Sequence, residues 1–285
     1  MGSALTPALR AAGHDVVRLV RRKPVGADEV FWDPAAGSLD ASQLGDIDAI
    51  INLAGENLGK GRWTAARKER IFRSRVDATR TLVAAMKQMP RKPRVFLSAS
   101  AVGFYGDRGE EPVDESSEIG QGFLPEVCLA WETHAEGARP IGVRVVLLRF
   151  GVVLAAKGGA LAKMLPIFRF ALGGRLGSGE QWMSWVSLQD IVGAVQHLLT
   201  ENVAGPVNVV SPHAVTNREF TATLAAVLRR PAMLSVPAWA LRLILGRGMA
   251  DEALLASCRA VPSKLVDTGY RFQTPELGDA LRAIL

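Results

Sequence analysis

The segment Ile47–Leu53 (IDAIINL) is a nearly continuous run of apolar, largely β-branched residues. Such a run is typical of a parallel strand that is buried on both faces of a sheet. A long amphipathic helical pattern follows over Trp63–Met89 and is closed by Pro90. Strand and helix patterns then keep alternating, with strands at Asp15–Val20, Val30–Trp32, Arg94–Ser98, Val143–Phe150 and Pro206–Val210 and helices at Glu126–Gly137, Leu188–Leu199 and Thr216–Leu228. This order predicts an α/β fold built on a doubly wound parallel sheet.

The first element is out of place for such a sheet. Residues Gly2–Ala12 predict a helix that ends at Gly13, and the strand Asp15–Val20 follows it. A Rossmann-type sheet begins instead with a strand and a glycine-rich turn, and only then has a helix. We therefore expect the first strand and most of the glycine-rich loop to be missing, as in a truncated or misassigned start, which leaves two strand edges unpaired. The alternative is that Gly2 is the N-cap of a fold that starts with a helix.

Composition restricts the class of protein. Hydrophobic residues make up 48% of the 285 residues and charged residues 22%, which is typical of a globular protein. No uncharged apolar stretch of about 18 residues occurs, so we expect no membrane span. The start of the chain does not resemble a signal peptide, and Cys128 and Cys258 are the only cysteines, which favours a cytoplasmic protein with reduced thiols.

The net charge of +6 raises the question of an anionic partner. The basic residues form no tail and no nucleic-acid motif, so we expect no nucleic-acid partner. A phosphorylated cofactor or substrate fits this distribution of charge better. No spacing of His or Cys residues predicts a metal site.

Three basic residues, Arg21, Arg22 and Lys23, directly follow the predicted strand Asp15–Val20. In a Rossmann-type fold the end of this strand faces the adenosine ribose of the dinucleotide. An acidic residue there accepts the 2′-hydroxyl of NAD, whereas an arginine accommodates the 2′-phosphate of NADP. A guanidinium group suits phosphate because it offers a planar, bidentate fork of donors. A solvated basic loop is the alternative, but the position at a strand end favours NADP.

Five segments resemble motifs of the extended short-chain dehydrogenase/reductase superfamily, in the expected order along nearly the whole chain. They are the loop tail Gly2-Ser3-Ala4-Leu5, the turn Asn52-Leu53-Ala54-Gly55, the turn Ser98–Gly106 (SASAVGFYG), the strand Arg149–Leu154 and the segment Trp185–Asp190 that returns to the core. Small residues in these turns let the backbone approach a cofactor closely.

More narrowly, the chain resembles an atypical branch known as the epimerase family. The segments that carry this likeness include Trp32-Asp33-Pro34, Ser74-Arg75, Trp131-Glu132, Gly158–Leu161, Leu172–Gly174, Gly177–Gly179 and Thr268–Tyr270. The resemblance implies NADP(H) binding. The expected contacts are Arg21 and Arg22 at the 2′-phosphate and, along the rest of the cofactor, Gly2, Asn52, Leu53, Ala54, Gly55, Arg75, Ser98, Arg149 and Val153.

The chain departs from the superfamily in its catalytic pair, a Tyr four residues before a Lys. The Lys lowers the pKa of the Tyr, which then exchanges a proton with the substrate. In the matching stretch 123–132 (FLPEVCLAWE) the pair falls on Phe123 and Val127 or on Leu124 and Cys128, and neither reading has a Tyr or a Lys.

We therefore expect Ser100 and Tyr105, on the turn after a predicted central strand, to be the catalytic residues. The alternatives are that Ser100 only caps the turn and that the Tyr105 hydroxyl is hydrogen-bonded to the backbone in a structural role. Glu56 is an alternative base, although a solvated or helix-capping role is the more common fate of such a residue. Cys128 is an alternative thiol acid, although burial in the core is its more common fate.

The expected organisation is a Rossmann NADP-binding core at 1–154, rejoined by 188–210, and a smaller C-terminal substrate domain at 155–187 and 211–285. Core packing is the default interpretation of the aromatic residues of the substrate domain, and the alternative is that some of them line a largely apolar cleft. The predicted function is an oxidoreductase acting on a small carbonyl or hydroxyl substrate, with a homodimer as a possible assembly. The alternatives are an NADP(H)-binding sensor or scaffold without chemistry, and a nucleotide-sugar epimerase.

Overall fold

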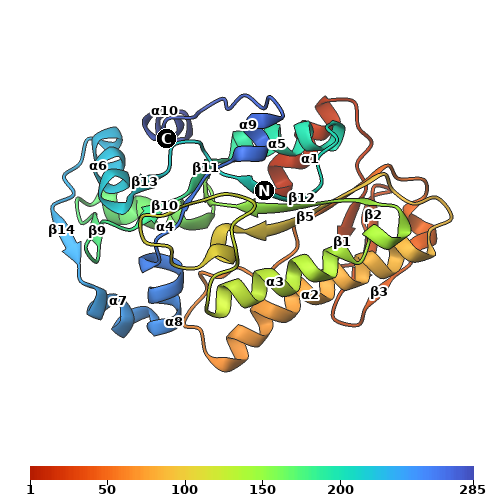
Figure 1. Cartoon of the computed structure of the whole chain (residues 1–285), viewed down its shortest axis with the longest axis horizontal. Helices are drawn as coiled ribbons and strands as arrows, with labels where there is room; N and C mark the ends of the chain where they lie inside the picture. Colours follow the sequence, from red (N-terminus) through yellow and green to blue (C-terminus); the bar gives the residue numbers. More distant parts are fainter.

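The computed structural model describes residues 1–285 as a layered α/β molecule (Figure 1). Its helices are α1 (Gly2–Ala11), α2 (Ala65–Gln88), α3 (Phe123–Glu136), α4 (Gly159–Arg169), α5 (Leu188–Thr200), α6 (Asn217–Leu228), α7 (Ala238–Leu245), α8 (Arg247–Ala250), α9 (Ser263–Asp267) and α10 (Leu277–Ile284). Short 3-10 turns lie at η1 (Ala41–Leu44), η2 (Val102–Tyr105) and η3 (Arg139–Ile141), and η4 (Asp251–Leu255) is a π-helical turn. None of these helices is both long and apolar enough to cross a membrane.

The strands are mostly short. They are β1 (Arg18–Val20), β2 (Glu29–Asp33), β3 (Ser38–Leu39), β4 (Ala49–Asn52), β5 (Val95–Ala101), β6 (Pro112–Val113), β7 (Arg144–Phe150), β8 (Val152–Leu154), β9 (Gly174–Leu176), β10 (Trp182–Met183), β11 (Trp185–Ser187), β12 (Gly205–Val209), β13 (Val215–Thr216), β14 (Leu234–Val236) and β15 (Arg259–Ala260).

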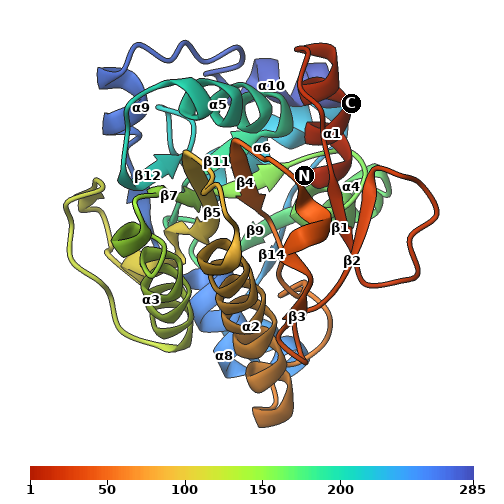
Figure 2. The same ribbon diagram turned by 90° about the vertical axis from the view of Figure 1, so that its right-hand side faces the viewer.

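The main sheet has four parallel strands in the order β12-β7-β5-β4. Helices α1 and α5 cover one face, and α2 and α3 cover the other (Figures 1 and 2). The two central strands, β5 and β7, are buried almost throughout, because helices shield both of their faces from water. This arrangement confirms the predicted α/β class with a Rossmann-type parallel sheet. It also places 205–209 in the same sheet as the N-terminal strands.

A second, three-stranded sheet holds β1, β2 and β3, with β1 and β2 parallel. No hydrogen bonds join β1 to β4, so each of these strands has one edge without a partner strand. The sequence predicted two unpaired edges of this kind. The helix α1 begins at Gly2 and buries Leu5 and Leu9 in the core beside β5 and β7, and the predicted first helix is thereby confirmed.

The C-terminal region has a hydrophobic core of its own. Side chains from α4, β11, α6 and α10 form this cluster, which includes Leu161, Phe168, Trp185, Phe220 and Leu281. A separate cluster gives this region its own stability, which supports a smaller second domain. The exact boundaries at 154, 187 and 210 stay a prediction.

The carboxylate of Asp190, in the first turn of α5, is 1% exposed and fastens a distant segment to the core. It accepts hydrogen bonds from Ser187 Oγ at 2.8 Å, Gln273 N at 2.7 Å, Thr274 Oγ1 at 2.8 Å and Tyr270 Oη at 3.2 Å. A buried carboxylate needs several such donors to offset its lost hydration. This one carboxylate therefore ties residues 270–274 to α5.

Candidate functional site

The turn that ends β4 is held by the buried amide of Asn52. Its Oδ1 accepts a hydrogen bond from Ala54 N at 3.1 Å, and its Nδ2 donates to Thr79 Oγ1 at 3.0 Å and to Ser98 Oγ at 3.4 Å. Asn52 therefore fixes the turn against β5 and α2, while Leu53 and Ala54 stay partly exposed. The predicted residues Asn52, Leu53, Ala54 and Ser98 are thus brought together at the carboxyl edge of the sheet, where open α/β sheets bind ligands.

Arg75, from α2, lies against this turn and is 8% exposed. Its guanidinium donates to Ile71 O at 2.9 Å and to Glu56 O at 3.2 Å, and a Cβ on Gly55 would come within 3.3 Å of its Cζ. No carboxylate forms an ion pair with Arg75. Burial of its guanidinium lowers the pKa of Arg75. Its Cζ stacks 5.0 Å from the ring centroid of Trp131, whose buried Nε1 has no hydrogen-bond partner. A buried cation without a counter-charge and a buried donor without a partner lie side by side here, and one acceptor group of a ligand would satisfy both.

Glu56 is engaged in contacts within the protein, through both its carboxylate and its backbone N–H. Its carboxylate pairs with the buried guanidinium of Arg67, and its backbone N donates to Ser74 Oγ at 3.0 Å. The carboxylate of Glu56 is therefore engaged by Arg67, and its backbone anchors the loop to α2. The geometry therefore favours the structural reading of Glu56.

At the end of β1, the two predicted phosphate ligands behave differently. Arg22 forms a two-point ion pair with Glu29, with N···O distances of 2.8 and 2.6 Å, and this contact holds the pKa of Glu29 down at about 2. Arg21 is exposed and makes no ion pair. Of the two, Arg21 therefore has its donors free for a phosphate, whereas donors of Arg22 are engaged by Glu29.

Two further predicted contacts lie at element ends. The helix α1 begins at Gly2 with no side-chain cap and no acidic residue in its first turn, so no side chain at its own start satisfies its first N–H groups. Val153 lies in β8, half-buried and paired with Val186 of β11.

Ser100 belongs to a buried polar network. Its Oγ donates to Glu132 Oε1 at 2.6 Å, and Arg149 clamps the same carboxylate with two bonds of 2.8 Å. Arg149 also donates to Tyr105 Oη at 3.0 Å, and that hydroxyl donates to Asn208 Oδ1 at 2.7 Å. The network links β5, α3, β7, η2 and β12, and it places Arg149 inside the protein rather than along the cofactor turn.

This network corrects the prediction for Tyr105. The side chain has no exposed surface, and its hydroxyl both donates and accepts a hydrogen bond within the protein. Burial raises the pKa of Tyr105 to about 12. Tyr105 therefore has no path to a substrate and fits a structural role, with side-chain partners instead of the backbone partner that the sequence suggested as its alternative.

The face of α3 that should carry the catalytic pair is closed by apolar packing. A Cβ on Gly103 would lie 3.4 Å from Leu124 Cβ and 3.9 Å from Cys128 Sγ, so these two residues face η2. The thiol of Cys128 is 3% exposed, and burial raises its pKa to about 12. Leu124 and Cys128, one of the two pairs expected at the positions of the Tyr and Lys, thus pack against η2, and Cys128 is a core residue.

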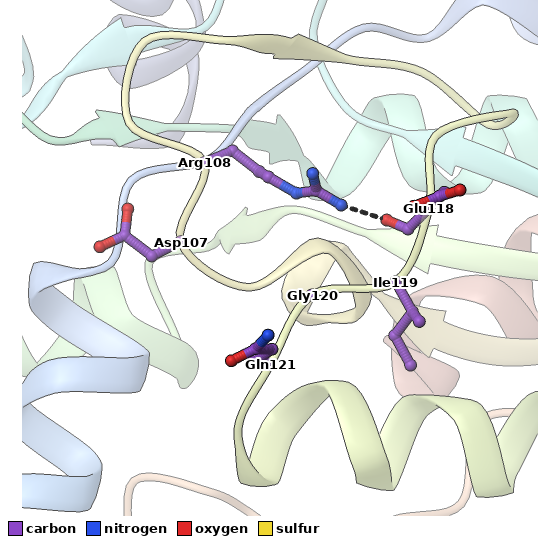
Figure 3. A pocket seen from close by; sticks show the side chains of 6 residues that line it. All are labelled: Asp107, Arg108, Glu118, Ile119, Gly120 and Gln121. Carbon is purple, nitrogen blue, oxygen red and sulfur yellow. Dashed lines mark hydrogen bonds between the residues drawn. The ribbon is translucent and has the colours of Figure 1, made fainter.

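A polar hollow of about 360 Å³ lies near the start of α3 (Figure 3). Its lining is Asp107, Arg108, Glu118, Ile119, Gly120 and Gln121, of which only Ile119 is hydrophobic. The aromatic residues Trp185 and Phe168 are buried in the C-terminal core and do not line this hollow. Sequence reasoning missed the charged loop because it looked for the cleft among aromatic residues, and it missed Trp131 as a polar group.

Helices on both faces of a parallel sheet, an asparagine-held turn at its carboxyl edge and a free arginine after β1 define a Rossmann-type protein of the dinucleotide-binding class. The model of the NAD dependent epimerase/dehydratase family matches residues 1–211, and the chain belongs to this family. A model described as a domain of unknown function (DUF1731) matches residues 236–284.

Relatives cover the chain almost completely. The epimerase family protein MT2273 of Mycobacterium tuberculosis is 45% identical over 282 residues, which are 99% of this chain and 93% of that protein. The human epimerase family protein SDR39U1 is 38% identical over 289 residues, 100% of this chain and 96% of that protein.

Solved structures give the same result. The crystal structure of human SDR39U1 with NADPH aligns with a TM-score of 0.90 and 34% identity, covering 99% of this chain and 95% of that one. A nucleoside-diphosphate sugar epimerase from Corynebacterium glutamicum aligns with a TM-score of 0.80 and 33% identity, covering 100% of this chain and 55% of that one. The predicted family is therefore confirmed.

Proposed function

We propose that this protein binds NADP(H) and acts as an oxidoreductase on a small molecule that carries a carbonyl or hydroxyl group. The observation that carries the proposal is the exposed guanidinium of Arg21 at the end of β1, free of any ion pair. Human SDR39U1, a relative with the same fold, was crystallised with NADPH, which supports the choice of NADP(H) over NAD(H).

The residues at the sheet edge fit a dinucleotide. The glycine at position 55 leaves the backbone close to Arg75, and the orphaned Nε1 of Trp131 offers a buried donor beside that guanidinium. Arg75 and Trp131 would hold an oxygen of the cofactor, Arg21 its 2′-phosphate, and the uncapped start of α1 would face its pyrophosphate. The bound nicotinamide would supply the hydride chemistry.

Ser100 is the residue that we assign to the substrate. Its proton is already donated to Glu132, so its Oγ has lone pairs left and accepts a hydrogen bond from a substrate hydroxyl. Arg149 holds Glu132 in place through two bonds and is a positioning residue. The Ser100 side chain is only 3% exposed, so a small group is needed to reach it.

Fluorescence titration with NADPH and NADH tests the proposal. We expect the protein to favour NADPH by at least about tenfold, or ~1.4 kcal/mol. Arg21→Ala should lose this preference, because a charge-assisted bond to phosphate is worth about 1.5–3 kcal/mol. Lys23→Ala, an exposed neighbour, is the matched control and should keep it. Equal, weak binding of both nucleotides by the unmodified protein would contradict the proposal.

A second candidate function is a cofactor-dependent sensor or scaffold without catalysis. It is favoured by the state of the acid–base groups, because Tyr105 and Cys128 are buried and Glu56 is ion-paired. NADPH binding without NADPH oxidation over a broad panel of aldehydes, ketones and quinones would favour this reading. Loss of such oxidation in Ser100→Ala would favour the oxidoreductase.

A nucleotide-sugar epimerase stays the third candidate, since the Corynebacterium glutamicum relative carries that description. The two cysteines are free thiols, which supports the predicted cytoplasmic location. A homodimer stays a prediction from the sequence.

A further inference from the structure

The C-terminal segment meets the core at the N-terminal ends of α2 and α3. Figure 1 shows α7 and α8 beside these ends. Arg62, just before α2, donates to Ile244 O at 3.0 Å and to Leu243 O, which are among the last carbonyls of α7. A cation at a helix C-terminus satisfies carbonyls that have no partner within the helix. One polar contact thus runs from the core to the C-terminal segment.

A second contact runs in the opposite direction. Glu252, in the π-helical turn η4, accepts a hydrogen bond on Oε2 from Leu124 N at 2.8 Å. The N-cap of α3, Gly122, has no side chain to cap the helix, so this carboxylate supplies the cap. Gly122 has a φ of 121°, and a Cβ there would lie 3.0 Å from Glu252 Oε2. The glycine therefore leaves room for the carboxylate to approach.

The other oxygen of Glu252 is uncommitted. It has no hydrogen-bond partner, and the carboxylate forms no ion pair with a basic side chain. Its attachment to the core consists of the α3 N-terminus alone. Single-turn π-helices are rare and concentrate at functional sites.

The first turn of α3 matters because of what it carries. Leu124 is one of the two residues that can match the superfamily's Tyr, and it packs with Cys128 against η2, at the end of the strand that holds Ser100. Under the proposed function, this turn forms one wall of the space for the nicotinamide and substrate. A shift of the turn would move that wall directly.

We propose that Glu252 is a positioning residue through which the C-terminal segment 236–284 fixes the first turn of α3 and completes the nicotinamide side of the site. The inference rests on the proposed function for its site, and on the Leu124–Glu252 bond for its geometry. This proposal assigns a specific structural role to the region matched by the domain of unknown function. Arg62 supports the same docking from the core side. It is a cation at the C-terminal end of α7, whereas Glu252 is an anion at the N-terminal end of α3.

The test uses the full-length protein and two readouts, the hydrogen exchange of the Leu124 amide and the emission of bound NADPH. Glu252→Ala should speed exchange at Leu124 by at least about tenfold, since it removes a bond to a charged acceptor. The emission of bound nicotinamide should move toward that of free NADPH, while the dissociation constant changes by less than about threefold, because the adenosine end is held at Arg21.

Glu252→Gln is the conservative variant. Its amide oxygen still accepts from Leu124 N, so exchange and emission should match those of the unmodified protein. Asp251→Ala is the matched control, because Asp251 lies in the same turn but pairs with Arg242 within the C-terminal segment. Arg62→Met tests the same docking through the other contact. It should also speed exchange at Leu124, because it weakens the attachment of the C-terminal segment to the core.

Unchanged exchange and emission in Glu252→Ala would overturn the inference, as would a lower melting temperature with unchanged bound-NADPH emission. If the unmodified protein binds no NADPH, the proposed function is refuted. The exchange measurement still shows whether Glu252 holds the Leu124 amide. Faster exchange at Leu124 in Glu252→Ala and Arg62→Met, but not in Asp251→Ala, would then show that the C-terminal segment fixes the first turn of α3, while its role at the nicotinamide would be refuted.

Discussion

Replacing Glu132 by Gln should destabilise this protein far more than a typical single substitution. The side chains of Glu132 and Arg149 are 8% and 4% exposed and are joined by two bonds of 2.8 Å. The amide of the introduced glutamine would turn an N–H₂ group toward one Arg149 nitrogen, so one of those bonds would be replaced by a contact between two donors. The guanidinium would stay buried without a counter-charge.

The size of the effect follows from this burial. Removing one partner of a buried ion pair costs about 3–5 kcal/mol, because an uncompensated charge is left in a low-dielectric interior. With an unfolding entropy of about 2.1 cal/mol/K per residue, a chain of 285 residues should lose about 5–8 °C in melting temperature.

Calorimetry on the single variants and on Glu132→Met/Arg149→Met distinguishes the ion pair from simple packing. Exchanging both partners for apolar residues removes the unpaired charge, so the double variant should be more stable than Glu132→Gln. Ser100→Ala, which leaves the pair intact, should cost only about 1 kcal/mol. A loss below about 1 kcal/mol for Glu132→Gln, or a double variant as unstable as the sum of its singles, would refute the reasoning.

Two further results should follow from the perturbed pKa values. Because Arg22 holds the folded-state pKa of Glu29 at about 2, below its unfolded value of about 4.3, this pair stabilises the fold above that unfolded value and is lost as the pH falls toward 2. Glu29→Gln should therefore flatten the acid limb of a stability–pH curve, whereas Glu69→Gln, an exposed control, should not. The native thiol of Cys128, with a pKa of about 12, should not react with an aromatic disulfide reagent at pH 8, and rapid labelling without denaturant would contradict its burial.

The elements that sequence predicted well are those whose signals are local. The predicted helix Thr216–Leu228 is an example, since it forms as α6 and begins with a capping box in which Thr216 and Glu219, three positions apart, bond each other's backbone N–H groups. The buried strand within Ile47–Leu53 and the long helix closed by Pro90 also lie close to their predicted places. Periodicity and caps are properties of neighbouring residues, so a single sequence contains them.

The contacts that sequence did not predict join residues far apart. The bond from Tyr105 to Asn208 spans 103 positions, and the bond from Leu124 to Glu252 spans 128. Nothing in the local pattern of Glu132 shows that it lies between Ser100 and Arg149. The role of Arg22 was similarly hidden, because Glu29 lies on the next strand and reaches it only through the parallel pairing of β1 and β2.

The attachment of residues 270–274 to Asp190 also has a consequence for the order of folding. The partners are 80 to 84 positions apart, so the intervening chain must be ordered before the bonds form, and closing such a loop costs entropy that nearby contacts do not. On a growing chain, α5 would emerge with its carboxylate still hydrated and the flank that Tyr270 and Phe272 later cover still open. The burial of that flank is therefore a late folding step. Before it occurs, the exposed apolar surface of α5 is available for a chaperone to bind.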